Sequence, residues 1–139
     1  GGIGGTLAGN ALVLAAMRAT LQEVLTDEAY ARMFALAERF EAGVEAAVAE
    51  AGLPWIVQRL GARVEYWFRD TPPANGGEAA ASIDPALDRY MHLAALNRGI
   101  LMTPFHNMAL MSPATSTADV DRHTAVFRES IAALLGAEP

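Results

Sequence analysis

The feature that most constrains the fold is a long apolar stripe that follows Thr26. Apolar side chains recur there at steps of three and four residues, which is the spacing of one face of an α-helix. The stripe consists of Tyr30, Met33, Phe34, Ala37, Phe40, Val44, Ala47, Val48 and Ala51. Thr26 is a favourable N-cap, Asp27 and Glu28 suit the positive end of the helix dipole, and Gly52 with Pro54 ends the helix. The rest of the chain must cover this face.

Short strands are the expected partners of that helix. The segment WIVQRLGARVEYWF (55–68) has the β-branched and aromatic content of strands, with Gly61 at a bend or bulge. The segments ILMTPF (100–105) and NMALMS (107–112) indicate two further short extended stretches. Between them, residues 70–82 (DTPPANGGEAAAS) are polar and rich in Pro and Gly, so we expect a mobile loop.

Three more helices are predicted by their capping residues. Asn10 precedes ALVLAAMRATLQEVL, a helix that is apolar on most sides and is expected to be largely buried. Asp84 followed by Pro85 begins the next helix. Ser116, with Asp119 three residues later, has the spacing of a capping box and begins the last one. Helices and strands are segregated, which predicts an α+β fold with a small, mainly antiparallel sheet.

Composition excludes several classes of function. The chain has 139 residues, a length that suits one domain, and a net charge of −6, which argues against a nucleic-acid-binding surface. No apolar run is long enough to span a bilayer, no signal peptide is visible, and we therefore expect no membrane partner. Cysteine is absent, so disulfides are excluded and a reducing, cytoplasmic location is expected.

The basic residues are all arginine, and this limits the available chemistry. Because no lysine occurs in the sequence, the chain cannot itself complete a reaction that needs a lysine amine as nucleophile. Arg63 stands among aromatic residues in a predicted strand, where a guanidinium needs a partner. That partner is either a substrate carboxylate or a nearby carboxylate such as Glu65 or Asp70. In a further alternative, Arg63 lies on the solvent face of the strand.

Metal and hydrolase sites find no support. No two of His92, His106 and His123 are four residues apart, as a helical metal site would require, and there is no cysteine to complete a zinc site. Ser112 and Ser130 lack the surroundings of a nucleophile elbow. We therefore expect no metal and no catalytic triad in this chain.

The N-terminal run GGIGGT has two explanations. Glycine-rich termini fray, so the run needs no function at all. Alternatively, glycine lets the backbone approach an anion closely, and a threonine adds amide and hydroxyl donors.

A resemblance favours the second explanation. The segment GGTLAGNALVLAAMRATL resembles the pattern G-T-[LFY]-[SQA]-G-N-P-L-A-x-A-A-x-x-A-T-L of class III (fold-type I) pyridoxal-phosphate-dependent aminotransferases. The segment NRGILMTPFHNMALMSPATSTADVDRHTAVF is similar to the closing pattern of the same family. The resemblance spans essentially the whole chain, and the nearest subgroup is the glutamate-1-semialdehyde aminomutase-like enzymes.

The resemblance implies that this chain is the C-terminal part of a larger enzyme. Residues 1–25 would be the end of the large, cofactor-binding domain, and residues 26–139 would be the small domain. The family's cofactor-binding lysine lies upstream, so no catalytic residue is expected here. In the family, the G-T pair binds the phosphate of the neighbouring subunit's cofactor, which carries over to Gly5 and Thr6 and implies a homodimer that uses pyridoxal 5'-phosphate.

The substrate side departs from the family pattern. Many members carry an arginine in the last strand that binds the substrate carboxylate, whereas MALMSP (108–113) has none. Asn107 stands where aminomutases often have the glutamate of F-E-A-G-F. We take Arg63 and Asn107 as candidate substrate-binding residues.

The activity implied is that of an aminotransferase acting between a small-molecule amine or amino acid and a keto acid or aldehyde. The first alternative is a glutamate-1-semialdehyde 2,1-aminomutase. The second is a free-standing α+β binding module without catalysis, which would use its aromatic strand as a partner surface.

Overall fold

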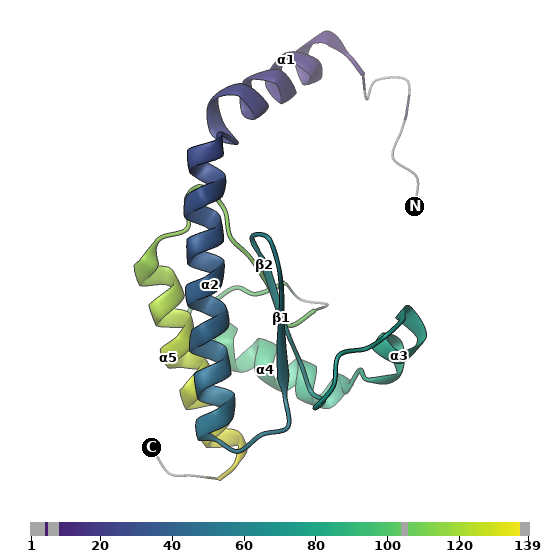
Figure 1. Ribbon diagram of the computed structural model, residues 1–139, viewed down its shortest axis with the longest axis vertical. Helices are drawn as coiled ribbons and strands as arrows, with labels where there is room; N and C mark the ends of the chain where they lie inside the picture. Colours follow the sequence, from purple (N-terminus) through teal and green to yellow (C-terminus); the bar gives the residue numbers. More distant parts are fainter. Residues whose placement is uncertain (1–4, 6–8, 104–105, 137–139) are drawn as a thin grey trace.

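The computed structural model describes residues 5, 9–103 and 106–136. The long helix α2 (Asp27–Glu50) packs against both α5 (Thr117–Leu134) and the sheet (Figure 1). Helix α4 (Pro85–Leu96) packs on α5. The α+β prediction with a small antiparallel sheet is therefore confirmed.

The sheet has three antiparallel strands in the order β1–β2–β3. Strands β1 (Ile56–Leu60) and β2 (Arg63–Trp67) form a hairpin, and β3 (Met108–Leu110) pairs with β2. The hairpin turn has only two residues, of which Gly61 has a φ of +60°. A positive φ at the first turn position matches a type II′ turn, where glycine is favoured, so the predicted bend at Gly61 is a tight hairpin turn.

The core lies where α2 meets the sheet and α5. The largest fully buried side chains are those of Val44 on α2, Val64 on β2, and Ser130 and Ile131 on α5. Most of the predicted stripe on α2 is buried, including Met33, Phe40 and Val48, but Tyr30 and Phe34 are exposed. The apolar spacing therefore identified the covered face, and only its N-terminal end remains open to solvent.

The predicted caps are present. The Thr26 hydroxyl accepts a hydrogen bond from the Ala29 amide at 3.2 Å, and Ser116 and Asp119 form a reciprocal capping box. Asp84 caps α4 by accepting from two backbone amides, and Pro85 follows it at the start of the helix. Each cap satisfies amide groups that the first helical turn cannot pair by itself.

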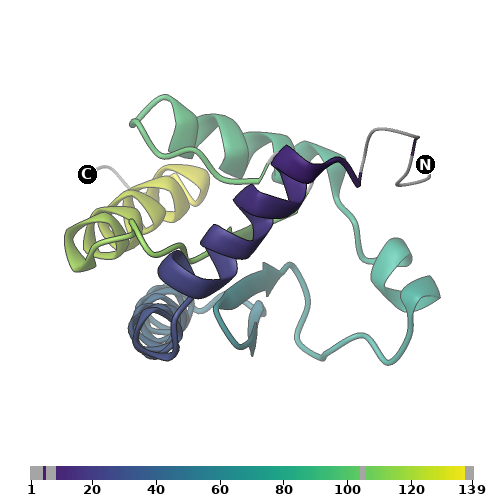
Figure 2. The same cartoon turned by 90° about the horizontal axis from the view of Figure 1, so that it is seen from above.

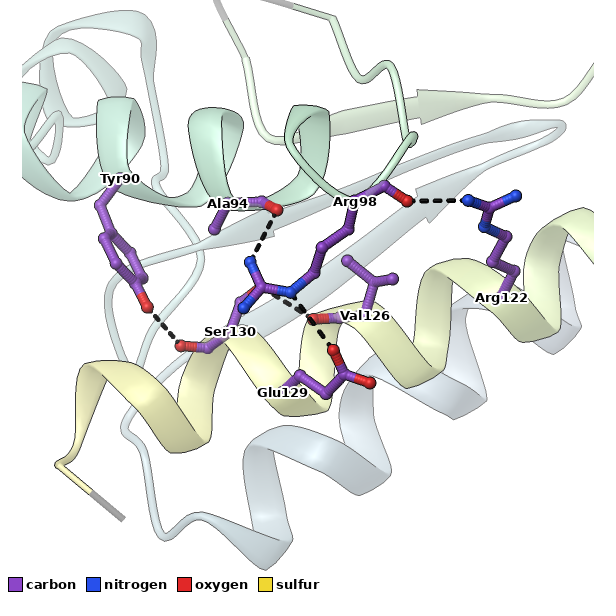
Figure 3. Close-up of polar contacts among 7 residues, drawn as sticks. All are labelled: Tyr90, Ala94, Arg98, Arg122, Val126, Glu129 and Ser130. Atoms are coloured by element: carbon purple, nitrogen blue, oxygen red, sulfur yellow. Dashed lines mark hydrogen bonds and ion pairs between the residues drawn. The ribbon is translucent and has the colours of Figure 1, made fainter. Parts of the chain in front are cut away.

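Helices α4 and α5 are joined by side-chain donors that bind backbone carbonyls (Figure 3). The Tyr90 hydroxyl donates to the Ser130 carbonyl at 2.8 Å, and Arg122 donates to the Arg98 carbonyl at 2.9 Å. The Arg98 guanidinium in turn contacts the Ala94 carbonyl and the Glu129 carboxylate. These bonds attach the end of α4 and the turn after it to α5.

The expected burial of the first helix is wrong for this chain. Helix α1 (Ala11–Ala19) continues into a π-helical turn, η1 (Thr20–Val24), and every residue from 9 to 24 is exposed. Leu12 is 80% and Met17 54% exposed. In both views α1 leads away from the end of α2 (Figures 1 and 2). Its apolar surface has no covering partner within the described residues.

Two further expectations need correction. Residues 70–82 are not simply a loop, because Gly76–Ala81 form a short helix, α3, capped by the Asn75 side chain. The alanine-rich second half of this segment favours helix, which outweighs its two glycines. Of the segment 100–105, the described residues 100–103 form no strand, so only one of the two extended stretches joins the sheet.

Candidate functional site

Two clefts meet at the N-terminal end of α4. They share four lining residues, which are Ile83, Asp88, His106 and Asn107. The first cleft, of about 210 Å³, is also lined by Glu65, Tyr66, Trp67, Phe68, Ala79, Ala80 and Ser82. The second cleft, of about 280 Å³, is also lined by Pro85, Arg89, His92 and Thr103. The shared residues therefore form the wall between two neighbouring hollows.

Asn107 is held from two sides. Its side-chain Nδ2 donates to the Asp88 Oδ1 at 2.8 Å, and its backbone carbonyl accepts from the Tyr66 amide at 3.1 Å. Because the amide nitrogen is engaged by Asp88, the Oδ1 of Asn107 is the acceptor that remains for another group. The structure thus places this predicted residue in a cleft wall with a defined orientation.

Arg63 has found its partner within the chain. Its Nη2 donates to the Oε2 of Glu65, and its Nε contacts the Sδ of Met108. Of the partners considered for Arg63, Glu65 is thus the one in contact. Arg63 is not among the residues that line the two clefts; it borders a separate hollow beside β1 and β2.

Glu65 links Arg63 to the cleft wall. The carboxylate is almost fully buried, and its Oε1 lies 3.5 Å from the Nδ1 of His106. A buried carboxylate needs a paired cation or hydrogen bonds, and Arg63 supplies both. Glu65 therefore links Arg63 to His106, the residue that precedes Asn107.

The aromatic part of the first cleft is strongly desolvated. Burial raises the pKa of the Tyr66 hydroxyl well above its usual range, and the negative charge of Asp88 raises that pKa further. The Nε1 of Trp67 is buried without a hydrogen-bond partner among the described residues, as is the Nδ1 of His92 in the second cleft. Tyr66 therefore stays protonated at neutral pH and can act as a donor.

The glycine-rich N-terminus is only partly described. Gly5 is exposed and has a φ of +142°, a backbone conformation that favours glycine. Thr6 lies outside the described residues. Asn10 caps α1 by accepting from the Val13 amide at 3.0 Å, as predicted. Gly5 is not among the residues that line the two clefts.

Sequence reasoning missed the contribution of Asp88. It stands in the first turn of α4, where an acidic residue is common because of the helix dipole, and so it gave no signal of a site. Its contact with Asn107 spans 19 positions of sequence, and no local pattern predicts it. The sequence likewise gave no signal that His106 belongs to a cleft wall. Within residues 5, 9–103 and 106–136, no group of His, Asp and Glu side chains could hold a metal ion.

Known proteins match almost the whole length of this chain. A crystal structure of a glutamate-1-semialdehyde aminomutase from Pseudomonas aeruginosa, in complex with PMP, is 54% identical and superposes with a TM-score of 0.89 over 98% of this chain. A glutamate-1-semialdehyde 2,1-aminomutase of Sorangium cellulosum is 37% identical over 93% of the chain.

The predicted resemblance to class III aminotransferases is thus confirmed. The chain is similar in sequence and structure to glutamate-1-semialdehyde aminomutases. It matches the C-terminal portion of these enzymes and spans 29% of the length of both relatives just described. An omega-transaminase from Sphaerobacter thermophilus shares the fold, with a TM-score of 0.79 at 23% identity, over 94% of this chain and 30% of its own.

No protein-family model matches the sequence. In the part of the chain that the structure describes, no helix combines the length and the apolar character needed to cross a membrane.

Proposed function

We propose that this chain is the C-terminal part of a pyridoxal-phosphate-dependent aminotransferase, which transfers an amino group between an amine or amino acid and a keto acid or aldehyde. The observation that carries the proposal is the 54% identity, over 98% of the chain, to an aminomutase solved with PMP. The same observation argues against a free-standing binding module.

The residues of this chain suit a supporting role toward the cofactor. When bound, pyridoxal phosphate supplies the electron sink for amino-group transfer. Since the chain contains no lysine, covalent attachment of the cofactor requires a residue outside positions 1–139. The positive φ of Gly5 fits a backbone that approaches a phosphate closely, and we propose that Gly5 and Thr6 hold the phosphate of the neighbouring subunit's cofactor.

On the substrate side, we propose that Asn107 and Arg63 form part of one wall of the pocket. Asn107 presents its Oδ1 beside the two clefts. Arg63 already neutralises Glu65, and its Nη1 remains to contact a substrate carboxylate. In this arrangement Glu65, which itself lines the first cleft beside His106, positions Arg63.

A division of the chain into the end of one domain and the whole of a second fits the same assignment. We propose that residues 1–25 complete the large domain and that residues 26–139 are the small domain. The exposure of residues 9–24, against the well-packed α2, is what a boundary near residue 25 would produce. We also propose a cytoplasmic homodimer: the cysteine-free sequence suits a reducing compartment, and the apolar surface of α1 suits a subunit interface.

An aminomutase is the second candidate, because several curated relatives carry that name. Such an enzyme moves the amino group from carbon 2 to carbon 1 of one substrate and needs no external acceptor. The two reactions are therefore separable in one experiment on the complete enzyme. The cofactor-loaded enzyme is given either an amine with a 2-oxo acid, or glutamate 1-semialdehyde alone.

Transfer to the 2-oxo acid supports the aminotransferase. Isomerisation of glutamate 1-semialdehyde without transfer supports the aminomutase. Absence of both reactions, in a preparation that shows bound cofactor by its absorbance, would refute the proposed function. The chain 1–139 alone is the negative control, because it has no lysine to retain the cofactor covalently.

A further inference from the structure

Asp88 is a half-buried carboxylate that faces both clefts without a cationic partner. Its Oδ1 accepts from Asn107, and no ion pair involves it among the described residues. Arg89 lines the second cleft but is not within 4.0 Å of this carboxylate. The charge of Glu65, by contrast, is neutralised by Arg63. Among the described residues, Asp88 therefore places a carboxylate with no ion-pair partner at the junction of the clefts.

The walls of the first cleft suit a ligand whose carbon chain ends in an ammonium group. Trp67, Phe68 and Ile83 provide apolar surface along the hollow. At its polar end stand the Asp88 carboxylate and the Oδ1 of Asn107, both of which accept hydrogen bonds. Aromatic faces also attract cations, which adds to the preference for an ammonium over a carboxylate.

We propose that the first cleft binds an ammonium group of the substrate that is remote from the reacting amine, and that Asp88 is its counter-ion. The preferred substrates would then be diamines or amino acids with a basic side chain. This inference rests on the proposed aminotransferase function and specifies its substrate class. Pairing with this half-buried carboxylate is what would distinguish such a substrate from a simple amine of the same length.

A purely structural role for Asp88 makes a different prediction. An acidic residue in the first turn of a helix stabilises the helix through its dipole, and loss of that stabilisation would affect all substrates alike. Asp84 provides a matched control, since it lies at the same helix end and lines neither cleft. Asparagine at position 84 still caps the helix, so Asp84→Asn removes a charge without removing the cap.

The test measures kcat/KM of the complete, cofactor-loaded enzyme for 1,5-diaminopentane and for pentylamine, with the same 2-oxo acid as acceptor. The unmodified enzyme should favour the diamine by roughly tenfold, the effect of one charge-assisted hydrogen bond. Asp88→Asn keeps an oxygen to accept from Asn107 but removes the charge, so it should abolish this preference. Asp84→Asn should retain it.

Three outcomes would overturn the inference. If the unmodified enzyme has equal kcat/KM for the two amines, the inference is wrong, and this result does not depend on whether the Asp88 variant folds. If Asp88→Asn keeps the preference for the diamine, Asp88 is not the counter-ion, and the proposed aminotransferase function still stands. Failure of the unmodified enzyme to use either amine, with cofactor bound and glutamate 1-semialdehyde isomerised, would remove the aminotransferase function and this inference together.

Discussion

Lowering the pH should destabilise this protein through one histidine, His123 on α5. Its side chain is 5% exposed and stacks on Phe40, with ring centroids 4.2 Å apart, and on Phe127 at 5.8 Å. Its Nδ1 has no hydrogen-bond partner among the described residues. Burial lowers the pKa of this imidazole from 6.5 to about 4, because the charged form cannot be solvated there.

The sign and size of the effect follow from that difference in pKa. Above pH 6.5 the imidazole is neutral in both the folded and unfolded states, so it adds no pH dependence. Between pH 6.5 and about 4, the unfolded chain takes up a proton that the folded chain does not. The free energy of unfolding then falls by about 1.4 kcal/mol per pH unit, to a total of roughly 3 kcal/mol.

Urea unfolding at pH 7, 6 and 5 measures this loss. Between pH 7 and pH 5 the contribution of His123 should fall by about 2 kcal/mol. His123→Phe keeps an aromatic ring in the stack but cannot be protonated, so its stability should fall less over the same range. His106→Gln, at an exposed position, should retain the full loss. If His123→Phe and the unmodified chain lost stability in parallel, the imidazole would not be excluded from protonation by burial.

Three other predictions concern packing, cofactor and assembly. Gly43→Ala should destabilise the chain by about 1–3 kcal/mol in urea unfolding, because the added Cβ would lie 2.5 Å from the Thr124 Oγ1; combining it with Thr124→Ala should recover part of the loss. In the complete enzyme, Thr6→Ala should weaken binding of pyridoxal phosphate roughly 10- to 150-fold in a titration, and unchanged affinity would place Thr6 away from the phosphate. The chain 1–139 should self-associate in sedimentation at rising concentration, and Leu14→Glu with Met17→Glu should make it monomeric; a chain that is monomeric without these changes would contradict this.

Local signals in the sequence predicted most of the fold. The spacing of apolar residues located α2 and its buried face, and Thr26 and Ser116 marked the starts of two helices. These features are readable because a helix repeats every 3.6 residues and a cap acts within one turn. Gly61 indicated a bend between the strands, because the positive φ of a hairpin turn is also a local requirement.

The errors arose where distant or absent partners decide the structure. The apolar helix 11–25 was expected to be buried, yet its residues up to Val24 are exposed and nothing within the described residues covers them. Residues 100–103 have strand-like composition, but pairing needs a neighbouring strand edge in the right register. The contact of Asn107 with Asp88 and the pairing of Arg63 with Glu65 depend on the tertiary structure. The sequence offered Glu65 as one candidate partner of Arg63 but gave no signal for Asp88.

The junction between α4 and α5 has a consequence for how this part of the molecule can evolve. Tyr90 and Arg122 both donate to main-chain carbonyls, and every amino acid carries such a carbonyl. Substitution of Ser130 or Arg98 therefore leaves the accepting carbonyl in place, whereas substitution of Tyr90 or Arg122 removes the donor and with it the bond. The sensitivity of these two bonds to substitution should thus be one-sided: changes at positions 90 and 122 remove them directly, whereas changes at Ser130 or Arg98 act only through the other contacts of those side chains.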